Sequence, residues 1–436
     1  MIGAAVRDQL PAPGPILASP FGKLAAFDGV SLRVSGLKAG TGALCRIGSA
    51  DAPAGHAVVT GFRDEDLLLM PLDNRATMSA GMPVSIVRHR SEIGVGDGLI
   101  GRAIDDSGVP VDGGGPVRCA GHWPLMSEAV AAVPVTEPLA TGIRSIDAAL
   151  TIGAGQRIGL IAPAGAGKTS LVERIAAEAD VDIVILALIG ERGREVSGAI
   201  RNYLRTARRD RTIIVAVPAD RTPLRRLRGA DRAVAIAEYF RDRGRRVLLV
   251  VDSLTRLAHA QREVGLAMGE PPATRGYPPS VFGLIPRLVE RAGAHENGGS
   301  ITGIYTVLAE DGDHRGDPVV ESAMAILDGH IVLTREQAAL GIYPAIDLTQ
   351  SISRIMDDIV PDDQMRAARH LRRLLQVHRD NRDLLMLGGY QPGTNPDLDM
   401  AIEREDGIRA FLAQHMSDHV APEAAVATMI DLVGTV

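Results

Sequence analysis

The alternation of apolar and polar residues changes its period twice along the chain. From about residue 25 to 92 the two kinds alternate in short segments such as SLRVSGL, ALCRIGS and HAVVTGF, separated by Gly, Asp and Asn turns. A period of two is typical of strands with one buried face, and several short strands at this spacing predict a small closed β-barrel. We therefore place an N-terminal barrel domain, with a short N-terminal extension, at residues 1–95.

A second pattern begins near residue 140. Runs that are apolar throughout, among them RIGLIA, DIVILALIG, TIIVAVP, RVLLVVD and SITGIYTVLA, alternate with helical stretches such as LVERIAAEA and AVAIAEYFRDRG. Strands of this kind connected by helices predict a parallel sheet that is buried on both faces. With the turn-rich passage VGDGLIGRAIDDSGVPVDGGGP before it, this pattern defines a central α/β domain at residues 96–360. The segment ALGIYPAIDL near its end is also interpreted as a strand.

The third pattern begins after Pro361, where the apolar runs stop. MRAARHLRRLLQVHRDNRDLLML and AIEREDGIRAFLAQHM carry the spacing of amphipathic helices, so residues 361–436 are predicted to form a helical domain. A chain of 436 residues is too long for a single ordinary core, which agrees with three domains.

Composition narrows the class of protein. The formal net charge of −6 offers no basic excess for a phosphate backbone, so we expect no nucleic-acid partner. Cys45 and Cys119 form neither a disulfide framework nor a metal-ligand spacing, which favours a reducing compartment. No signal-peptide core is evident, and no apolar run reaches the ~18 residues of a membrane span. We expect a cytoplasmic protein, and we interpret the arginine clusters RNYLRTARRDR and RTPLRRLRGADR as solvated faces or contacts between subunits.

The segment APAGAGKTS, residues 162–170, carries the most specific chemistry. It resembles the phosphate-binding pattern Gly-x4-Gly-Lys-Ser/Thr, except that Ala162 stands at the first Gly position. In such a loop the backbone N–H groups and the following helix N-terminus favour an anion. Lys168 can reach the β- and γ-phosphates of a nucleotide, and the Thr169 hydroxyl can ligate Mg²⁺. The alternative is a Gly-rich turn between a strand and a helix that binds nothing. The predicted nucleotide-binding residues of the loop are Gly165, Ala166, Gly167, Lys168, Thr169 and Ser170.

Two carboxylates are predicted at the same edge of the sheet. Asp252 ends the apolar run RRVLLVVD, where it could support Mg²⁺, although it could instead cap the helix that follows. Glu191 follows the strand in LALIGERGREVSG and could orient or deprotonate an attacking water, although GERGRE could also be a solvated charge cluster. Arg192 could meet phosphate, whereas Arg354 in SISR has no evident partner in the sequence.

Together these segments resemble the catalytic subunits of rotary ATP synthases and, within that superfamily, the ATPases of type III protein export. GEPPATRGYPPS and DGHIVL are more specific to this resemblance than the phosphate loop is. The resemblance implies a RecA-like P-loop domain between a β-barrel and a helical domain. It also implies that Glu191 is the catalytic carboxylate, that Arg192 assists at the γ-phosphate and that Tyr343 stacks on adenine. Arg354 would be an arginine finger that acts on the ATP of a neighbouring subunit, and Met416 is a candidate for the second wall of the adenine pocket.

The resemblance also implies the cofactors and partners, which are ATP, Mg²⁺ and further copies of the chain. Because Lys168, Glu191 and Arg354 occur in one chain, a homo-oligomeric ring is sufficient, and six copies are expected. The other implied partners are a peripheral-stalk-like regulator that contacts the first ~20 residues, a central-stalk-like subunit, the export gate and chaperone–cargo complexes. The location implied is the cytoplasmic face of the inner membrane, with peripheral membrane association.

Three alternatives to a flagellar export ATPase stay open at this stage. Flagellar export is favoured, and an injectisome ATPase carries the same motifs. A hexameric RNA translocase of the transcription-terminator type shares the loop, but residues 1–95 offer only Phe21, Phe27 and Phe62 for base stacking. A non-catalytic ring subunit is disfavoured by the presence of Glu191.

Overall fold

The computed structural model describes residues 21–73, 77–88, 91–127, 133–205, 207–309 and 316–434. The chain divides after Ser91 into two compact units, Met1–Ser91 and Glu92–Val436. The stalk contact predicted for the first ~20 residues lies outside the described part. The three domain ranges drawn from the sequence stay predictions.

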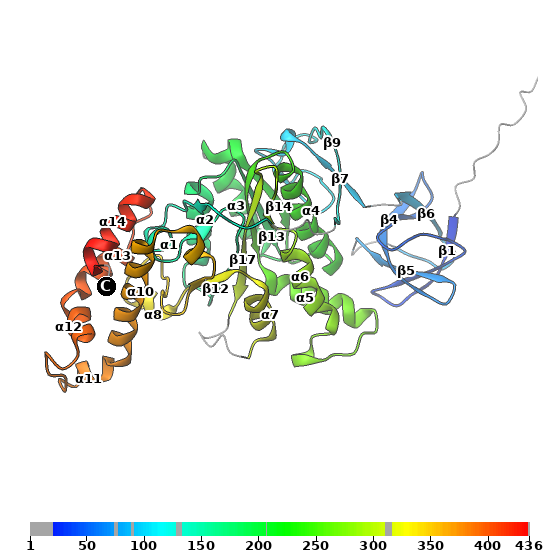
Figure 1. Ribbon diagram of the computed structural model, residues 1–436. Helices are drawn as coiled ribbons and strands as arrows, with labels where there is room; N and C mark the ends of the chain where they lie inside the picture. The colour runs from blue at the N-terminus through cyan, green and yellow to red at the C-terminus, as the bar shows by residue number, and fades with distance from the viewer. Residues whose placement is uncertain are drawn as a thin grey trace, which may run out of the picture. The chain divides into compact units, whose positions relative to one another are not determined.

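The first unit contains a closed barrel of six strands, as the alternating pattern predicts (Figure 1). Its strand order is β1-β2-β5-β4-β3-β6, and β1 pairs with β6 to close it. The inward positions are fully buried at Leu32, Val34, Ile47 and Leu69. Closure leaves no unpaired sheet edge, which stabilises a small β domain against pairing with other chains. The strands are β1 (Phe21–Phe27), β2 (Leu32–Ser35), β3 (Leu44–Gly48), β4 (Pro53–Arg63), β5 (Asp66–Pro71) and β6 (Pro83–Arg88).

The second unit is built on a nine-stranded sheet with the order β19-β18-β12-β17-β15-β13-β14-β8, and β16 pairs with β17. The strands from β18 to β8 run parallel to one another, as the unbroken apolar runs predict. Every residue of β14 is buried. The sheet consists of β8 (Ala103–Ile104), β12 (Arg157–Ala162), β13 (Ile183–Ile189), β14 (Thr212–Val217), β15 (Arg246–Asp252), β16 (Gly293–Ala294), β17 (Ser300–Leu308), β18 (Gly329–Val332) and β19 (Ile352–Ser353). Two small antiparallel pairs join β7 (Glu92–Val95) with β9 (Gly121–Pro124) and β10 (Pro138–Leu139) with β11 (Ile152–Gly153).

Helices connect these strands, and α4 packs against β13, β14 and β15. The helices up to the end of the sheet are α1 (Arg144–Ala149), α2 (Lys168–Glu178), α3 (Gly193–Arg205), α4 (Pro223–Arg241), α5 (Leu254–Ala267), α6 (Pro279–Val289), α7 (Pro318–Ile326) and α8 (Arg335–Ala339). Short 3-10 turns lie at Asp97–Leu99, Ala207–Arg211 and Thr274–Gly276. The strand predicted for ALGIYPAIDL is wrong, because the end of α8 and turns occupy this segment, and its one β-type pairing among the described residues is an isolated bridge from Leu333 to Ile346.

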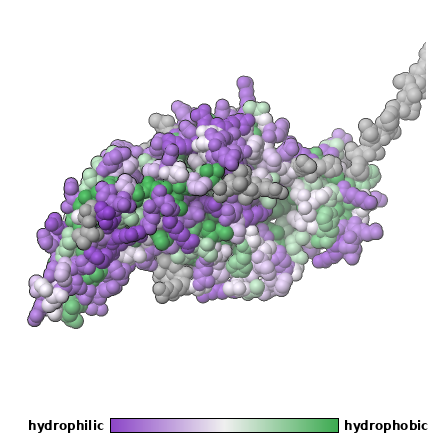
Figure 2. Space-filling model, viewed as in Figure 1, coloured by the Kyte–Doolittle hydropathy of each residue, from purple (hydrophilic) through white to green (hydrophobic). Residues whose placement is uncertain are grey.

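The chain ends in helices, as predicted, and they share a core with the sheet unit. Helices α10 and α14 pack on α1, and Leu371, Phe411 and Met429 belong to the same buried cluster as Ile146. Figure 2 shows hydrophilic residues over most of the visible surface of these helices, so their apolar faces are turned inward. The helices are α9 (Met356–Ile359), α10 (Asp362–Asp380), α11 (Arg382–Met386), α12 (Pro396–Glu403), α13 (Glu405–Leu412) and α14 (Pro422–Val433).

The cluster RTPLRRLRGADR is less exposed than its charge suggests. Arg225 binds Asp105 at 2.7 Å and the fully buried Asp106 at 2.6 Å, and Arg232 donates to the Asp106 carbonyl oxygen at 2.7 Å. Arg232 is itself only 5% exposed. The expectation of a solvated face is therefore wrong for these two arginines, because an acidic turn that the sequence does not place beside α4 pairs with them.

Candidate active site

The phosphate loop lies between β12 and α2, as the sequence predicts. Gly165 and Gly167 have φ angles of 84° and 88°, a left-handed region that favours glycine. Gly167 occupies the N-cap of α2 and offers no side chain to the first-turn N–H groups, so these groups remain available to an anion. Beside them Thr169 and Ser170 are exposed and Ala166 is buried. The turn can therefore receive phosphate groups.

Ala162 precedes the turn rather than forming part of it. It is the last residue of β12, pairs with Leu308 of β17 and is fully buried. An extended residue of this kind needs none of the conformational freedom of glycine. The substitution at the first position of the motif is thus explained by the strand running one residue into the motif.

The carboxyl ends of β13 and β15 bring the two predicted carboxylates to Lys168. Leu188 pairs with Asp252 in the sheet, so Glu191, three residues later, lies at the same edge. Nζ of Lys168 lies 2.5 Å from Oδ1 of Asp252 and 3.9 Å from Oε1 of Glu191. The structure therefore joins these three predicted residues in one cluster.

Asp252 is held from a second side by Thr306 of β17, whose buried hydroxyl donates to Oδ1 at 2.6 Å. The alternative role of Asp252 as a helix cap is not realised. Ser253 is the N-cap of α5, and its hydroxyl accepts from the N–H of Arg256 at 3.3 Å. Asp252 is consequently free to face the phosphate loop.

Arg256, a residue without a predicted role, is the main partner of Glu191. Nε and Nη2 of Arg256 donate to the two carboxylate oxygens of Glu191 at 2.9 and 3.0 Å. Gly190 has a φ of 74°, and a Cβ there would come within 3.1 Å of the Arg256 side chain. The glycine before Glu191 and the arginine in VDSLTR were the signals for this pair, since a close approach of strand and helix needs a residue without a side chain.

The surroundings of Glu191 set its basicity. Burial and the negative charge of Asp252 raise its pKa above the ordinary value, while Lys168 and Arg256 act in the opposite direction. The net direction is upward. A carboxylate with a raised pKa accepts a proton more readily, which suits a group that takes a proton from water.

The structure places Tyr343 and Arg192 differently with respect to this cluster. A Cβ on Gly167 would lie 3.9 Å from Cδ1 of Tyr343, so the half-exposed ring stands beside the phosphate loop. The Arg192 side chain is 68% exposed and pairs with Glu195 at 3.4 Å. The Tyr343 carbonyl accepts from the N–H of Gln414 at 2.7 Å, which brings the loop after α13 to the same place.

Arg354 lies at the opposite end of the sheet. Its N–H donates to the carbonyl of Asp328, and the N–H of Asp328 donates to the carbonyl of Arg157, the first residue of β12. Its guanidinium donates to the Met324 carbonyl at 3.1 Å. The phosphate loop begins after Ala162 at the other end of the same strand, about 16 Å away at ~3.3 Å per residue. Arg354 therefore lies far from the cluster of Lys168, Glu191 and Asp252 in its own chain.

Comparison with known proteins identifies the family. A family model described as "ATP synthase alpha/beta family, nucleotide-binding domain" matches residues 142–353, and one described as "T3SS EscN ATPase C-terminal domain" matches residues 360–431. The chain is 43% identical over 404 residues to a flagellum-specific ATP synthase of Pseudomonas aeruginosa, with 91% of this chain and 89% of the relative covered. It belongs to the type III protein export ATPases.

Both branches of the family and a solved structure resemble this export ATPase. A type 3 secretion system ATPase of Xanthomonas euvesicatoria is 44% identical over 398 residues, which cover 90% of each chain. The assembled ATPase EscN of enteropathogenic E. coli superposes with a TM-score of 0.88 at 37% identity, over 94% of this chain and 100% of that one. These similarities confirm the predicted fold and the predicted ATPase activity.

The donor set of the export ATPase fits a magnesium nucleotide. The described residues contain no cluster of three or more His, Cys, Asp or Glu that could hold a metal ion alone. A Cβ on Gly165 would meet no atom within 4 Å, so the turn is open to a ligand. The Thr169 hydroxyl and the Asp252 carboxylate are oxygen donors of the kind that Mg²⁺ prefers when phosphate oxygens complete its shell.

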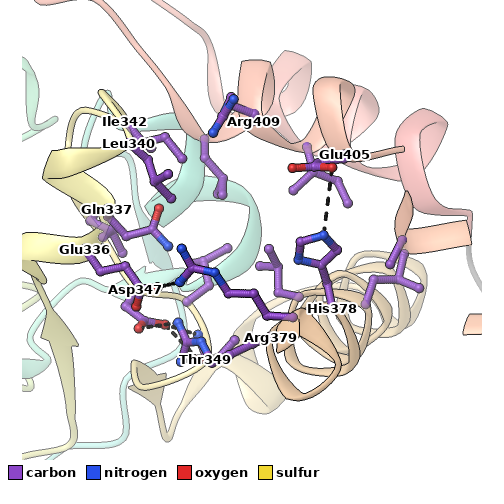
Figure 3. Close-up of a pocket in the computed structure, with 18 residues that line it drawn as sticks. Glu336, Gln337, Leu340, Ile342, Asp347, Thr349, His378, Arg379, Glu405 and Arg409 are labelled. Atoms are coloured by element: carbon purple, nitrogen blue, oxygen red, sulfur yellow. Dashed lines mark hydrogen bonds and ion pairs between the residues drawn. The ribbon is translucent and has the colours of Figure 1, made fainter. Parts of the chain in front are cut away.

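A separate cavity of about 210 Å³ lies among α8, α10, α12 and α13 of the export ATPase, and none of the predicted site residues lines it. Figure 3 shows Arg379 directed toward Asp347 and Thr349, with His378 turned toward Glu405. Arg379 binds Asp347 at 2.6 Å. Although burial raises the pKa of Asp347, hydrogen bonds from Thr349 and Gln350 and the charge of Arg379 hold it below its ordinary value. This pair fastens α10 to the segment after Tyr343.

In the part of the chain that the structure describes, no helix is both long and apolar enough to cross a membrane.

Proposed function

We propose that the export ATPase hydrolyses magnesium ATP at the cluster of Lys168, Glu191 and Asp252. Lys168 neutralises the β- and γ-phosphates, and Glu191 orients the attacking water and accepts its proton. Mg²⁺ held by Thr169 and supported by Asp252 supplies charge neutralisation at the phosphate oxygens. The observation that carries this proposal is the distance of 3.9 Å between Lys168 and the raised-pKa carboxylate of Glu191.

Two further side chains complete the nucleotide site in this proposal. The Tyr343 ring stacks on adenine, supported by its place beside Gly167. Met416, 54% exposed in the loop after α13, forms the second wall. Arg192 assists at the γ-phosphate, because its guanidinium is exposed and can turn toward the nucleotide.

We further propose that Arg354 acts on the ATP of a neighbouring copy in a ring of six. Its place at the far end of β12 supports this role, because a side chain there cannot span the strand to its own phosphate loop. The solved relative EscN is described as assembled, and in a second structure as being in complex with its central stalk EscO. A central-stalk-like subunit is accordingly the first expected partner. A peripheral-stalk-like regulator, the export gate and chaperone–cargo complexes at the inner membrane follow from the same family.

The export pathway proposed is flagellar, with release and unfolding of cargo as the work done. The injectisome is the alternative, because relatives named for each system are 43% and 44% identical. Deletion of the gene in the source bacterium tests the choice. Loss of hook and filament protein from the medium, restored by the intact gene, supports the flagellar role. If the deletion left filaments normal and abolished needle secretion, the protein would be assigned to the injectisome instead.

The catalytic role is tested with Glu191→Gln, which keeps the shape but accepts no proton. We expect kcat to fall by roughly 10²–10⁴-fold while ATP binding is retained. Glu195→Gln is the control for charge on α3, since the Glu195 side chain is 47% exposed, forms an ion pair with Arg192 at 3.4 Å and has the smallest of the effects that raise the pKa of Glu191. A Glu191→Gln variant with full activity would show that the chain has another base. Equal losses in both variants would trace the effect to the charge of α3.

A further inference from the structure

The loop between α13 and α14, residues 413–421, is fastened to the helix that carries Lys168. Arg174 lies two turns into α2 and is 4% exposed. Its guanidinium donates to the main-chain carbonyl oxygens of His415 at 2.8 Å and Asp418 at 2.5 Å, with a longer contact of 3.4 Å to that of Gln414. One side chain thus holds three points of the loop.

The helical period explains why α2 can do this. Arg174 and Glu178 are four residues apart and share one face, while Leu171 and Ile175 point into the core. Glu178 contacts the same loop, because its Oε2 lies 2.9 Å from Nδ1 of His419. One face of α2 packs on the sheet unit, and the neighbouring face binds the loop.

The partners of Arg174 are unusual for a buried charge. Every hydrogen bond that the structure describes for it runs to a main-chain carbonyl oxygen, the fourth being that of Gly142 at 3.5 Å. Burial lowers the pKa of the guanidinium, with Glu178 and Asp418 acting in the opposite direction. Carbonyl acceptors fix the path of the backbone rather than the identity of side chains. The arginine is therefore suited to setting where the loop runs.

Gln414 connects the same loop to Tyr343. It is 4% exposed, and its N–H donates to the Tyr343 carbonyl at 2.7 Å. Its side chain is fixed as well, since it donates to the Gly142 carbonyl at 3.0 Å and accepts from the N–H of Arg144 at 2.8 Å. Met416 follows two residues later and is exposed.

We infer that Arg174 is a positioning residue for recognition of the nucleotide base. By fixing residues 413–421 against α2, it holds Met416 and, through Gln414, Tyr343 at the places from which they enclose adenine. This inference rests on the proposed adenine site. Arg174 itself touches neither base nor phosphate, so its loss weakens contacts to the base and leaves contacts to the phosphates unchanged.

The test compares two ligands in the full-length protein. Isothermal titration calorimetry measures the affinity for magnesium ADP, which carries the base, and for magnesium pyrophosphate, which does not. Arg174→Met is expected to weaken ADP binding about tenfold, the loss of part of a stacking contact, and pyrophosphate binding less than about twofold. Arg174→Lys should recover part of the difference, because an ammonium can donate to some of the carbonyls.

Arg211, at the end of the turn Ala207–Arg211, supplies a matched control that binds the same helix. It donates to the carbonyl oxygens of Ala176, Ala177, Ala179 and Val181 at the end of α2. Arg211→Met removes a comparable guanidinium and is expected to change the two affinities equally. An equal change in Arg174→Met would overturn the inference, because it would reduce Arg174 to a general support of α2.

A measurement without nucleotide separates this inference from the proposed function. Amide hydrogen exchange within residues 413–421 should accelerate in Arg174→Met and not in Arg211→Met, and unchanged exchange would refute the fastening. If the wild-type protein bound pyrophosphate but gained nothing from the base of ADP, the adenine site would be wrong. If Lys168→Ala left pyrophosphate binding intact, the phosphate site would be wrong.

Discussion

The ring proposal can be decided by mixing two inactive variants. Lys168→Ala removes the ammonium that lies 2.5 Å from Asp252, and Arg354→Ala removes the guanidinium at the other end of β12. The finger is worth about 10³–10⁵ in kcat, so each variant should be inactive alone. Arg354 is exposed and donates to a single carbonyl, a contact worth about 1 kcal/mol, so its removal should leave the melting temperature nearly unchanged.

The activity of the mixture follows from the geometry. In a ring that forms from equal amounts of both variants, half of the chains retain Lys168. About half of these sit beside a neighbour that retains Arg354, so about a quarter of all sites should be complete. ATP hydrolysis per chain, measured after the dilute variants are mixed and concentrated, should therefore return to about a quarter of the wild-type rate.

The control for this experiment uses two defects at one site. Lys168 and Glu191 belong to the same cluster, so a mixture of Lys168→Ala with Glu191→Gln contains no complete site and should stay inactive. If the mixture with Arg354→Ala also stayed inactive although both variants entered the rings, the finger would not act between chains. Activity of wild-type protein that did not depend on concentration would argue in the same direction.

The remaining predictions concern single sites. Ala162→Gly should leave kcat unchanged in a steady-state assay and cost at most about 1 kcal/mol, because the residue is an interior strand position. Arg256→Met removes a cation that lowers the pKa of Glu191, so the acid limb of the kcat–pH profile should move to higher pH, and an unmoved limb would contradict the pairing. Burial raises the pKa of Asp147 to about 6 from an ordinary 3.8, so the stability it contributes is present at low pH and lost as pH rises through about 6. Between pH 4 and 6 the wild-type melting temperature should fall relative to that of Asp147→Asn.

The phosphate loop and the two carboxylates could be predicted because each depends on local pattern. An apolar run followed by Gly167 and Lys168 defines a strand, a turn and a helix. A carboxylate directly after such a run, as at Asp252, must lie at the carboxyl edge of a parallel sheet. Neither inference needs the order of the strands.

The contacts of Glu191 and Arg354 could not be predicted in the same way. The pair of Glu191 with Arg256 depends on β13 and β15 being neighbours, which the sequence pattern leaves open. The place of Arg354 depends on β19 running antiparallel beside β18. The failed strand at ALGIYPAIDL has another cause, since Ile342, Ile346 and Leu348 belong to a buried cluster that includes residues of α10 and α13.

The separation of Arg354 from Lys168 along β12 also bears on how the protein behaves before it is assembled. Under the proposed mechanism every subunit contributes Arg354 to the site of one neighbour and receives Arg354 from the other neighbour. This is a head-to-tail arrangement, and a closed ring completes every site. A newly made subunit would then hold nucleotide yet leave it almost intact. Unassembled subunits would therefore hydrolyse little ATP in the cell without a dedicated inhibitor. The rate of hydrolysis would then indicate how much of the protein has assembled into rings.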